Sequence, residues 1–243
     1  MRMLSFAKRC IKEILRDPLN ILFGVGFPVI LLILLTTIQA NVPVELFKIE
    51  TLTPGVIVFG LSFLTLFSST IVAKDRENAF LHRLYTTPLK PIDYILGYML
   101  PIIPIALAQS LICFLVAICL KLPITINILY TFLMIIPISI IYITLGLLCG
   151  SLFNVKQVGG ICGALLTNLS AWLSGVWFDI SYVGNAFETI ANILPFVHFV
   201  ELQRSLMIGE FSNLLVHLYP IIIYIFITTI GAILLFLRQM KRQ

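Results

Sequence analysis

The sequence predicts an all-α, polytopic membrane protein with six transmembrane helices, and three observations lead to this fold class. Hydrophobic residues make up 60% of the 243 residues and charged residues only 11%, with a mean hydropathy of +1.07; soluble domains carry roughly 25% charged residues. Several apolar runs are long enough to cross a hydrocarbon core of about 30 Å. Lys and Arg gather on one side of the topology that these runs define. We expect a single transmembrane domain over residues 1–243, without a soluble domain, so its energy source would be a separate protein.

The apolar runs set the boundaries of the expected spans. The six runs lie at about residues 19–38, 54–73, 94–120, 126–150, 158–178 and 217–237. The first run is too long for the core of a signal peptide and is followed by no small-residue cleavage site, so we expect it to be retained as a span. Only a few residues join the third and fourth runs, which predicts a tight helical hairpin.

The positions of the basic residues predict the orientation of the chain. With both termini inside, thirteen of the sixteen fall in inner segments: Arg2, Lys8, Arg9, Lys12, Arg16, Lys74, Arg76, Arg83, Lys90, Lys156, Arg238, Lys241 and Arg242. The outer segments keep only Lys48, Lys121 and Arg204. This asymmetry follows the positive-inside rule and explains the net charge of +5 without a nucleic-acid partner. We expect a multi-pass protein of the plasma membrane, surrounded by membrane lipid, with both termini in the cytoplasm.

Two amphipathic segments lie outside the spans. Residues 4–17 place apolar side chains on one arc and charged side chains on the other, which predicts a helix in the inner interface. A basic retention signal beside the first span would explain the charges but not their segregation. Residues 187–208 keep helical apolar periodicity that is broken at Pro195, which predicts outer, re-entrant helices that dip into the leaflet before the sixth span.

A charged, proline-punctuated island at residues 74–93 separates the second and third spans. Apolar residues recur at helical spacing from Asp75 to Tyr85, which predicts a short surface helix. Thr87, which precedes Pro88, leaves the helical region and ends this helix. The residues that would face a soluble partner are Arg76, Glu77, Phe80, Leu81, Arg83 and Leu84. The alternative is an ordinary solvated loop.

Polar side chains stand within two of the spans, and four of them are candidates for a functional role. Ser62, Thr65 and Ser69 share one face of the second span, and Asn168 lies near the middle of the fifth. Such residues either bond to a neighbouring helix or line a wet pathway. The sequence leaves both interpretations open.

Small residues predict where helices pack closely. Small-xxx-small pairs occur at Gly146 with Gly150 and at Gly159 with Gly163. The five cysteines lie within or against apolar runs, and no two form a Cys-x-x-Cys pair: Cys10, Cys113, Cys119, Cys149 and Cys162. We expect them to be packing residues rather than disulfides or metal ligands.

Several classes of function require motifs that the sequence lacks. It contains no Gly-x-x-x-x-Gly-Lys phosphate loop and no His-Glu-x-x-His pair. His82, His198 and His217 lie on different segments without ligand spacing. No carboxylate pair occupies one span, which disfavours a proton relay or an ion pump. We therefore expect no catalytic residue, no metal site and no cofactor in this chain.

Three stretches between about residues 74 and 209 together form a recognisable pattern. Their residues are Arg76, Glu77, Leu81, Leu84, Thr87, Pro88, Leu89 and Gly97; Ser174, Gly175 and Phe178; and Asn192, Pro195, Phe196, Glu201, Arg204 and Gly209. In this order the chain resembles the type-2 ATP-binding-cassette (ABC) transporter permeases, the membrane subunits of bacterial exporters. It departs from them at four positions: Gly, Thr and Glu are usual where Ala79, Phe80 and His82 stand, and a Pro is frequent at Asp179.

The resemblance implies a half-transporter. Two permease subunits, identical or related, would bind two ATPase subunits, which carry the ATP and Mg, on the inner face. The charged island would hold the coupling helix, which docks in a groove on the ATPase. The second and fifth spans, with their four polar residues, would border the pathway, and Pro195, Glu201 and Arg204 would form an outer motif.

The resemblance also implies a range of substrates. The family exports drugs, including multidrug substrates, peptides, lipid-linked glycans and other amphiphiles. The short outer segments of this chain suit an amphiphile better than a folded protein. An ATPase-independent channel or receptor is the alternative function, and co-purification of an ATPase would distinguish the two.

Overall fold

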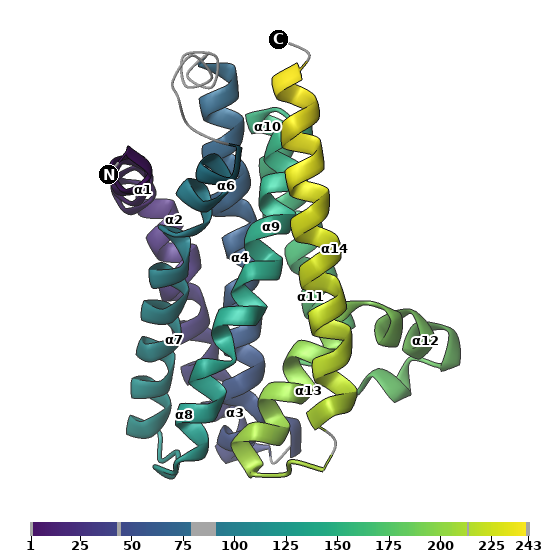
Figure 1. Ribbon diagram of the computed structural model, residues 1–243. Helices are drawn as coiled ribbons and strands as arrows, with labels where there is room; N and C mark the ends of the chain where they lie inside the picture. Colours follow the sequence, from purple (N-terminus) through teal and green to yellow (C-terminus); the bar gives the residue numbers. More distant parts are fainter. Residues whose placement is uncertain (1, 43–44, 79–90, 213, 242–243) are drawn as a thin grey trace.

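The computed structural model describes residues 2–42, 45–78, 91–212 and 214–241. Within these residues every regular element is a helix, as predicted. In chain order they are α1 (Arg2–Arg16), α2 (Pro18–Ile21), η1 (Leu22–Gly26), α3 (Phe27–Asn41), η2 (Glu45–Phe47), α4 (Ile49–Glu77), α6 (Pro91–Met99), α7 (Ile102–Cys119), α8 (Asn127–Leu133), α9 (Ile135–Leu152), α10 (Val155–Val158), η3 (Gly159–Leu166), α11 (Thr167–Leu173), η4 (Ile180–Tyr182), α12 (Asn185–Ile193), α13 (Pro195–Ile208) and α14 (Leu214–Lys241). They form an elongated bundle (Figure 1). α1 and the last turns of α14 lie toward one end, which we call the α1 end, and α8 lies at the opposite end, which we call the α8 end.

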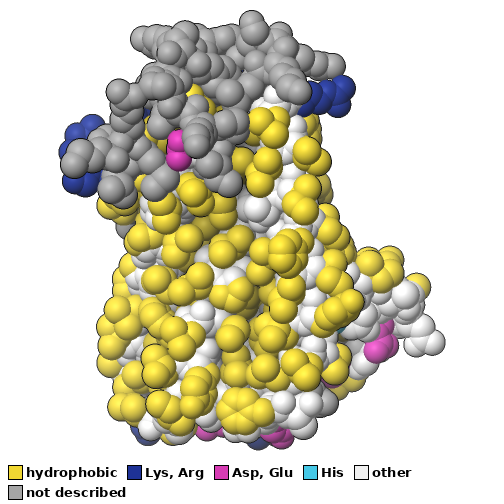
Figure 2. Space-filling model, viewed as in Figure 1, with side chains coloured by type: hydrophobic (Ala, Val, Ile, Leu, Met, Phe, Trp, Pro, Cys, Tyr) yellow, Lys and Arg dark blue, Asp and Glu magenta, His cyan; other side chains and the backbone are white. Residues whose placement is uncertain are grey.

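Five helical stretches among the described residues are long and apolar enough to cross a membrane. They are Leu22–Asn41, Ile49–Glu77, Asp93–Cys119, Asn127–Leu152 and Leu214–Arg238. These coincide with the first, second, third, fourth and sixth predicted spans, and apolar side chains cover the visible shaft of the bundle (Figure 2). The chain is therefore a multi-pass membrane protein. Residues 158–173 of the fifth predicted span are helical, in the end of α10, η3 and α11. This stretch is not one of the five, so the count of six spans stays a prediction.

α4 is the central helix of the bundle. It has 29 residues, of which 21 are buried. It packs most extensively against α9 and also contacts α7, α13 and α3. A methyl group added to Gly150 of α9 would lie 2.5 Å from the Ser69 carbonyl oxygen, so the two backbones approach each other only because glycine is present. Close packing at Gly146 and Gly150 is confirmed, whereas Gly159 faces open space.

α4 continues into the charged island. Asp75, Arg76 and Glu77 form its last turn, and the Asn78 amide still donates to the Lys74 carbonyl at 3.0 Å. The surface helix predicted from Asp75 to Tyr85 is therefore wrong in its start, because Asp75, Arg76 and Glu77 belong to α4; residues 79–85 lie outside the described residues. The physical reason is that the Asp75 side chain is buried, 1% exposed, where α4 meets other helices, so this turn belongs to the packed bundle. The predicted coupling residues Phe80, Leu81, Arg83 and Leu84 lie outside the described residues.

α1 is the amphipathic helix that the sequence predicts. Cys10 and Ile14 are buried, whereas Lys8, Lys12 and Arg16 are exposed. Figure 1 shows α1 nearly end-on, lying across the direction of the long bundle helices. Segregated faces on a helix that crosses the bundle axis favour an interfacial helix over a simple retention signal.

Several helices begin at or directly after a proline. α13 begins at Pro195, as the sequence predicts, and α7 begins directly after Pro101, inside the third predicted span. α13 packs against α14, α4 and α8, whereas α12 projects from the side of the bundle (Figure 1). Gly209 ends α13 with a φ of +85°, the left-handed conformation that glycine adopts at helix C-termini. The depth at which α12 and α13 enter a membrane stays a prediction.

Candidate functional site

The last turn of α4 is the polar centre of the α1 end. Three consecutive side chains, Asp75, Arg76 and Glu77, each bind another part of the chain, and we call these three residues the α4 junction. Successive residues of an α-helix point about 100° apart, so three in a row face three neighbours. These neighbours are α1 with α6, the end of α9, and the start of α10.

Asp75 joins α1 and α6 to α4. Arg9 of α1 donates two hydrogen bonds to this carboxylate, from Nη1 to Oδ2 at 2.8 Å and from Nη2 to Oδ1 at 2.5 Å. Tyr98 of α6 donates its hydroxyl to Oδ2 at 2.9 Å, and Phe6 packs edge-on against the Tyr98 ring with 4.8 Å between centroids. Because two parallel bonds from a guanidinium fix orientation as well as position, α1 is held to α4 in one geometry.

The buried carboxylate also affects the titration of its neighbours on α1. The hydrogen bond to Asp75 raises the pKa of Arg9 above its ordinary value, against the opposing effect of burial. Burial, followed by the charge of Asp75, raises the pKa of Cys10 to about 12. Arg9 therefore stays charged and Cys10 stays a neutral thiol at physiological pH, so the joint between α1 and α4 does not depend on titration of either group.

Arg76 and Glu77 bind the connection between α9 and α10. Arg76 donates from Nη1 to the Ser151 carbonyl and from Nη2 to the Phe153 carbonyl, the latter at 2.6 Å. Glu77 Oε1 accepts a hydrogen bond from the Val155 amide at 2.9 Å. A cation at the last carbonyls of one helix and an anion at the first amide of the next match the dipoles of both ends. The α4 junction thus ties the end of α4 to α1, α6, α9 and α10.

The sequence predicts that Arg76 and Glu77 face a soluble partner, but in the structure Arg76 donates and Glu77 accepts hydrogen bonds within their own chain. Sequence reasoning assigned no role to Asp75, Arg9 or Tyr98. The available signal was an acidic residue at the edge of an apolar run and a basic residue on an amphipathic helix, but nothing in their spacing pairs them. The coupling role of Arg76 and Glu77 stays a prediction. Its basis is the position of these residues at the end of α4, because their charged groups are already engaged within the chain.

The four predicted pathway residues are not brought together within the chain. Ser62 and Ser69 donate to carbonyls three residues earlier in α4, and Thr65 donates to the Tyr142 carbonyl of α9 at 3.1 Å. All three are buried. Asn168 is exposed on α11 and donates to a carbonyl one turn earlier at 2.8 Å. Within one subunit the hydroxyl groups lie in the packed interior around α4, and a role in a pathway between subunits stays a prediction.

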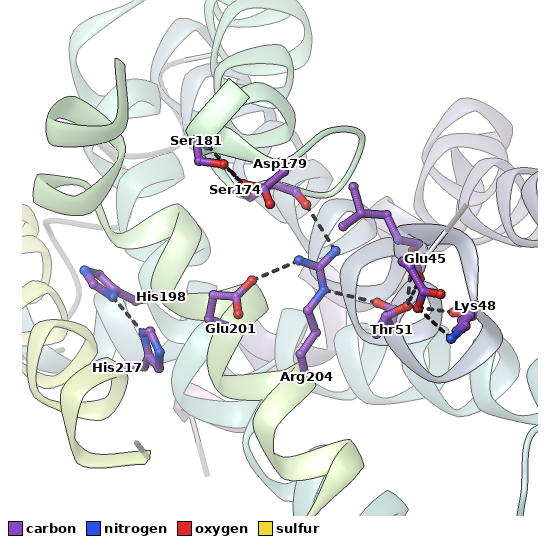
Figure 3. Close-up of polar contacts among 12 residues, drawn as sticks. Glu45, Lys48, Thr51, Ser174, Asp179, Ser181, His198, Glu201, Arg204 and His217 are labelled. Atoms are coloured by element: carbon purple, nitrogen blue, oxygen red, sulfur yellow. Dashed lines mark hydrogen bonds and ion pairs between the residues drawn. The ribbon is translucent and has the colours of Figure 1, made fainter. Parts of the chain in front are cut away.

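A second polar cluster surrounds Arg204 of α13 (Figure 3). Arg204 is 8% exposed and donates to the Thr51 carbonyl of α4 at 3.2 Å, the Glu201 carboxylate at 2.9 Å and the Gly175 carbonyl at 3.1 Å. Gly175 has a φ of +70°, a left-handed conformation that favours glycine. The guanidinium therefore joins α13 to the start of α4 and to the segment after α11. Of the predicted outer motif, Glu201 and Arg204 are in contact, and Pro195 begins α13.

Replacing Arg204 with Lys is expected to destabilise the protein by about 1–3 kcal/mol, because an ammonium cannot reproduce three bonds in a planar fork and a buried carbonyl loses its donor. The thermal unfolding midpoint of the detergent-solubilised chain measures this effect. Arg238→Lys, the same change at an exposed position of α14, is the matched control and should leave the midpoint nearly unchanged. Equal midpoints for the two variants would contradict the role assigned to Arg204.

His198 of α13 and His217 of α14 lie in contact, although the sequence analysis treats the histidines as separate. Their Nδ1 atoms are 3.1 Å apart, and His198 Nε2 lies 2.9 Å from the Asn192 carbonyl. A carbonyl only accepts, so in the neutral pair His198 carries its proton on Nε2 and His217 donates from Nδ1. The pair links the joint between α12 and α13 to α14.

Comparison with known proteins identifies the family of the chain. The sequence profile of the family described as "ABC-2 type transporter" matches residues 2–208, a stretch that includes α1, the α4 junction and the Arg204 cluster. No curated protein matches the chain. The family match covers well over half of the chain. The protein therefore belongs to the ABC-2 type transporter family, and it is a membrane permease subunit of an ABC transporter.

Proposed function

We propose that this permease exports an amphiphilic or hydrophobic substrate, such as a drug, a peptide or a lipid-like molecule, by alternating access driven by a separate ABC ATPase. The observation that carries the proposal is the α4 junction. The sequence predicts the coupling helix from Asp75 to Tyr85, and the first three residues of that segment tie α4 to four other helices. A force from an ATPase on that segment would act on α4 at once.

α4 is suited to carry such a displacement through the subunit. It is a continuous helix from Ile49 to Glu77, about 44 Å long at the usual rise per residue. Its first turn is bonded through the Thr51 carbonyl to Arg204, at the opposite end from the α4 junction. Closely packed helices favour discrete alternative arrangements over continuous deformation. A push at the α4 junction would therefore reach the Arg204 cluster and change which end of the pathway is open.

The assembly that we propose follows the family resemblance. Two permease subunits, identical or related, would bind two ATPase subunits carrying ATP and Mg, with both permease termini in the cytoplasm. The amphiphilic substrate class is supported by the short connection between α7 and α8, which offers no room for an outer domain that handles folded proteins. Asn168 presents an amide on an exposed apolar surface, because Leu165 and Trp172 beside it are also exposed. Two such surfaces facing each other would suit an amphiphile.

The proposal is tested by replacing Phe80 and Leu84 together with Asp. These residues lie outside the described residues and enter through the sequence alone, as the apolar patch of the coupling helix. We expect the double variant to insert into the membrane but to lose ATP-driven transport, because a charged patch cannot enter an apolar groove. Amphiphile export from cells and the ATPase activity that co-purifies with the tagged subunit are the two measurements.

Ile124→Asp with Ile126→Asp is the matched control. It places two aspartates on an exposed apolar pair in the connection between α7 and α8, away from the α4 junction, and should leave coupling intact. Normal transport by the Phe80/Leu84 variant would show that the coupling assignment is wrong. A tagged subunit that never co-purifies with an ATPase would instead favour an ATPase-independent channel or receptor.

A further inference from the structure

An apolar cavity of about 310 Å³ lies where α1, the beginning of the first span, α4 and α7 meet. Its lining includes Ile14, Leu15, Val25, Phe67, Ile105 and Ala108. Asn20 is the one amide in the lining, and it donates to the Ile14 carbonyl at 3.3 Å. The cavity therefore offers an unidentified occupant apolar contact and almost no hydrogen bonding.

Three backbone irregularities create this space. Asp17 separates α1 from α2, a π-helix occupies Leu22–Gly26, and the chain breaks at Pro101 between α6 and α7. Each interrupts the regular side-chain rows by which two helices close against each other. π-helical turns also occur frequently at functional sites. The convergence of all three at one point leaves a hollow that the neighbouring side chains do not fill.

The cavity opens sideways, to the lateral surface of the bundle. Leu15 is 51% exposed, and Pro104 and Ala108 of α7 are also exposed. Water binds weakly in such a site, because an apolar cavity offers it no hydrogen-bond partners. α7 is part of a predicted membrane span, so the molecule next to the opening is lipid, and an acyl chain matches the lining.

A row of positive charge lies beside the cavity on α1. Lys8, Lys12 and Arg16 are spaced four residues apart and are exposed. In the part of the chain that the structure describes, none of the three forms an ion pair, whereas Arg9 is engaged by Asp75 and Glu13. Figure 2 shows Lys and Arg side chains gathered at this flank of the molecule, beside the apolar shaft. A basic row on an interfacial helix attracts anionic lipid headgroups.

We propose that this cavity is a binding site for an anionic glycerophospholipid. One acyl chain occupies the hollow between α1, α4 and α7, and the phosphate contacts the basic row of Lys8, Lys12 and Arg16. The bound lipid braces α1, the helix that Arg9 ties to the α4 junction. This site is separate from the substrate pathway proposed above and does not depend on it.

Native mass spectrometry of the full-length subunit, released from detergent with phosphatidylglycerol or phosphatidylcholine of identical chains, tests the proposal. We expect the wild-type chain to retain one phosphatidylglycerol more tightly than phosphatidylcholine. Ala108→Trp, which fills the opening, should abolish retention of both lipids at this site. The triple variant Lys8→Gln, Lys12→Gln, Arg16→Gln should keep phosphatidylcholine binding but weaken phosphatidylglycerol binding by about fivefold per residue replaced.

Two matched controls make the result specific. Leu115→Trp places the same large side chain on an exposed position of α7 outside the cavity lining, and it should retain the lipid. The triple variant Lys48→Gln, Lys121→Gln, Lys156→Gln removes the same charge from exposed positions elsewhere and should keep the preference for phosphatidylglycerol. Equal retention of both lipids by the wild-type chain, undiminished binding by Ala108→Trp, or equal losses in the two triple variants would overturn the proposal.

Discussion

Asp75→Asn is expected to uncouple the transporter and to destabilise the permease by about 3 kcal/mol, because it removes the anion from a buried, hydrogen-bonded ion pair. Asp75 is 1% exposed and accepts from both Arg9 and Tyr98. The Arg9 side chain is 36% exposed and can regain some hydration, which places the cost at the lower end of the range for broken buried pairs. The unfolding midpoint in detergent and ATP-driven transport in vesicles measure the two effects.

Glu13→Gln is the control for this variant. It removes the other carboxylate that pairs with Arg9, at 2.9 Å, but this pair is partly exposed, so the expected cost is under about 1 kcal/mol. The triple variant Arg9→Met, Asp75→Leu and Tyr98→Phe should regain stability, since apolar residues can replace a buried pair. Tyr98→Phe is included because the buried Tyr98 hydroxyl would otherwise lose its acceptor. The triple variant should not regain transport, because the two parallel bonds that orient α1 are gone. Equal effects of Asp75→Asn and Glu13→Gln would contradict the assigned role.

Gly150→Ala is expected to have the second large effect, a loss of about 1–3 kcal/mol from overpacking at the centre of the bundle. The added methyl would lie 2.5 Å from the Ser69 carbonyl oxygen and 2.9 Å from the Ser69 Cα. Both are backbone atoms, which cannot rotate away as a side chain could. α9 and α4 would have to move apart, which would weaken the most extensive helix contact that α4 makes. The unfolding midpoint and the yield of monodisperse protein measure the loss.

Gly159→Ala is the matched control because no atom lies within 4 Å of the added methyl. Alanine is the better helix former, so this change should raise stability by about 0.5–1 kcal/mol. The two substitutions are chemically identical and lie nine positions apart, yet their effects should have opposite signs. A loss at position 159, or none at position 150, would show that the α4–α9 contact is not as close as described.

Several features of the fold could be predicted from local sequence. Pro195 predicted where α13 begins, and the segregation of charged from apolar residues predicted α1 as an amphipathic helix. The spacing of Gly146 and Gly150 indicated where two helices meet closely, but the same spacing at Gly159 and Gly163 indicated nothing comparable, because Gly159 has no neighbour. A small-residue pair permits a close approach, and only the partner helix decides whether one occurs.

The candidate site was less accessible from the sequence. Arg76 and Glu77 were identified as functional from the charged island, but their partners, the Ser151 and Phe153 carbonyls and the Val155 amide, are backbone groups that no side-chain motif reveals. The end of α4 was also misplaced, because the charged residues there predicted the start of a water-exposed segment. Charge at the end of an apolar run normally indicates water, and here the first charged residues remain part of the packed helix.

The sequence by itself determined that the protein is helical, embedded in a membrane and related to the ABC-2 type transporters, because hydropathy, helical periodicity and motif order are local properties of the chain. Only the tertiary structure decided which charges are paired. Arg9 and Asp75 are 66 residues apart, Arg204 reaches a carbonyl 153 residues away, and His198 meets His217 across two helices. A polar group that is removed from water costs free energy unless it finds a hydrogen-bond partner, so burial decides which of these contacts matter. Burial depends on which helices pack together rather than on any pattern within one of them.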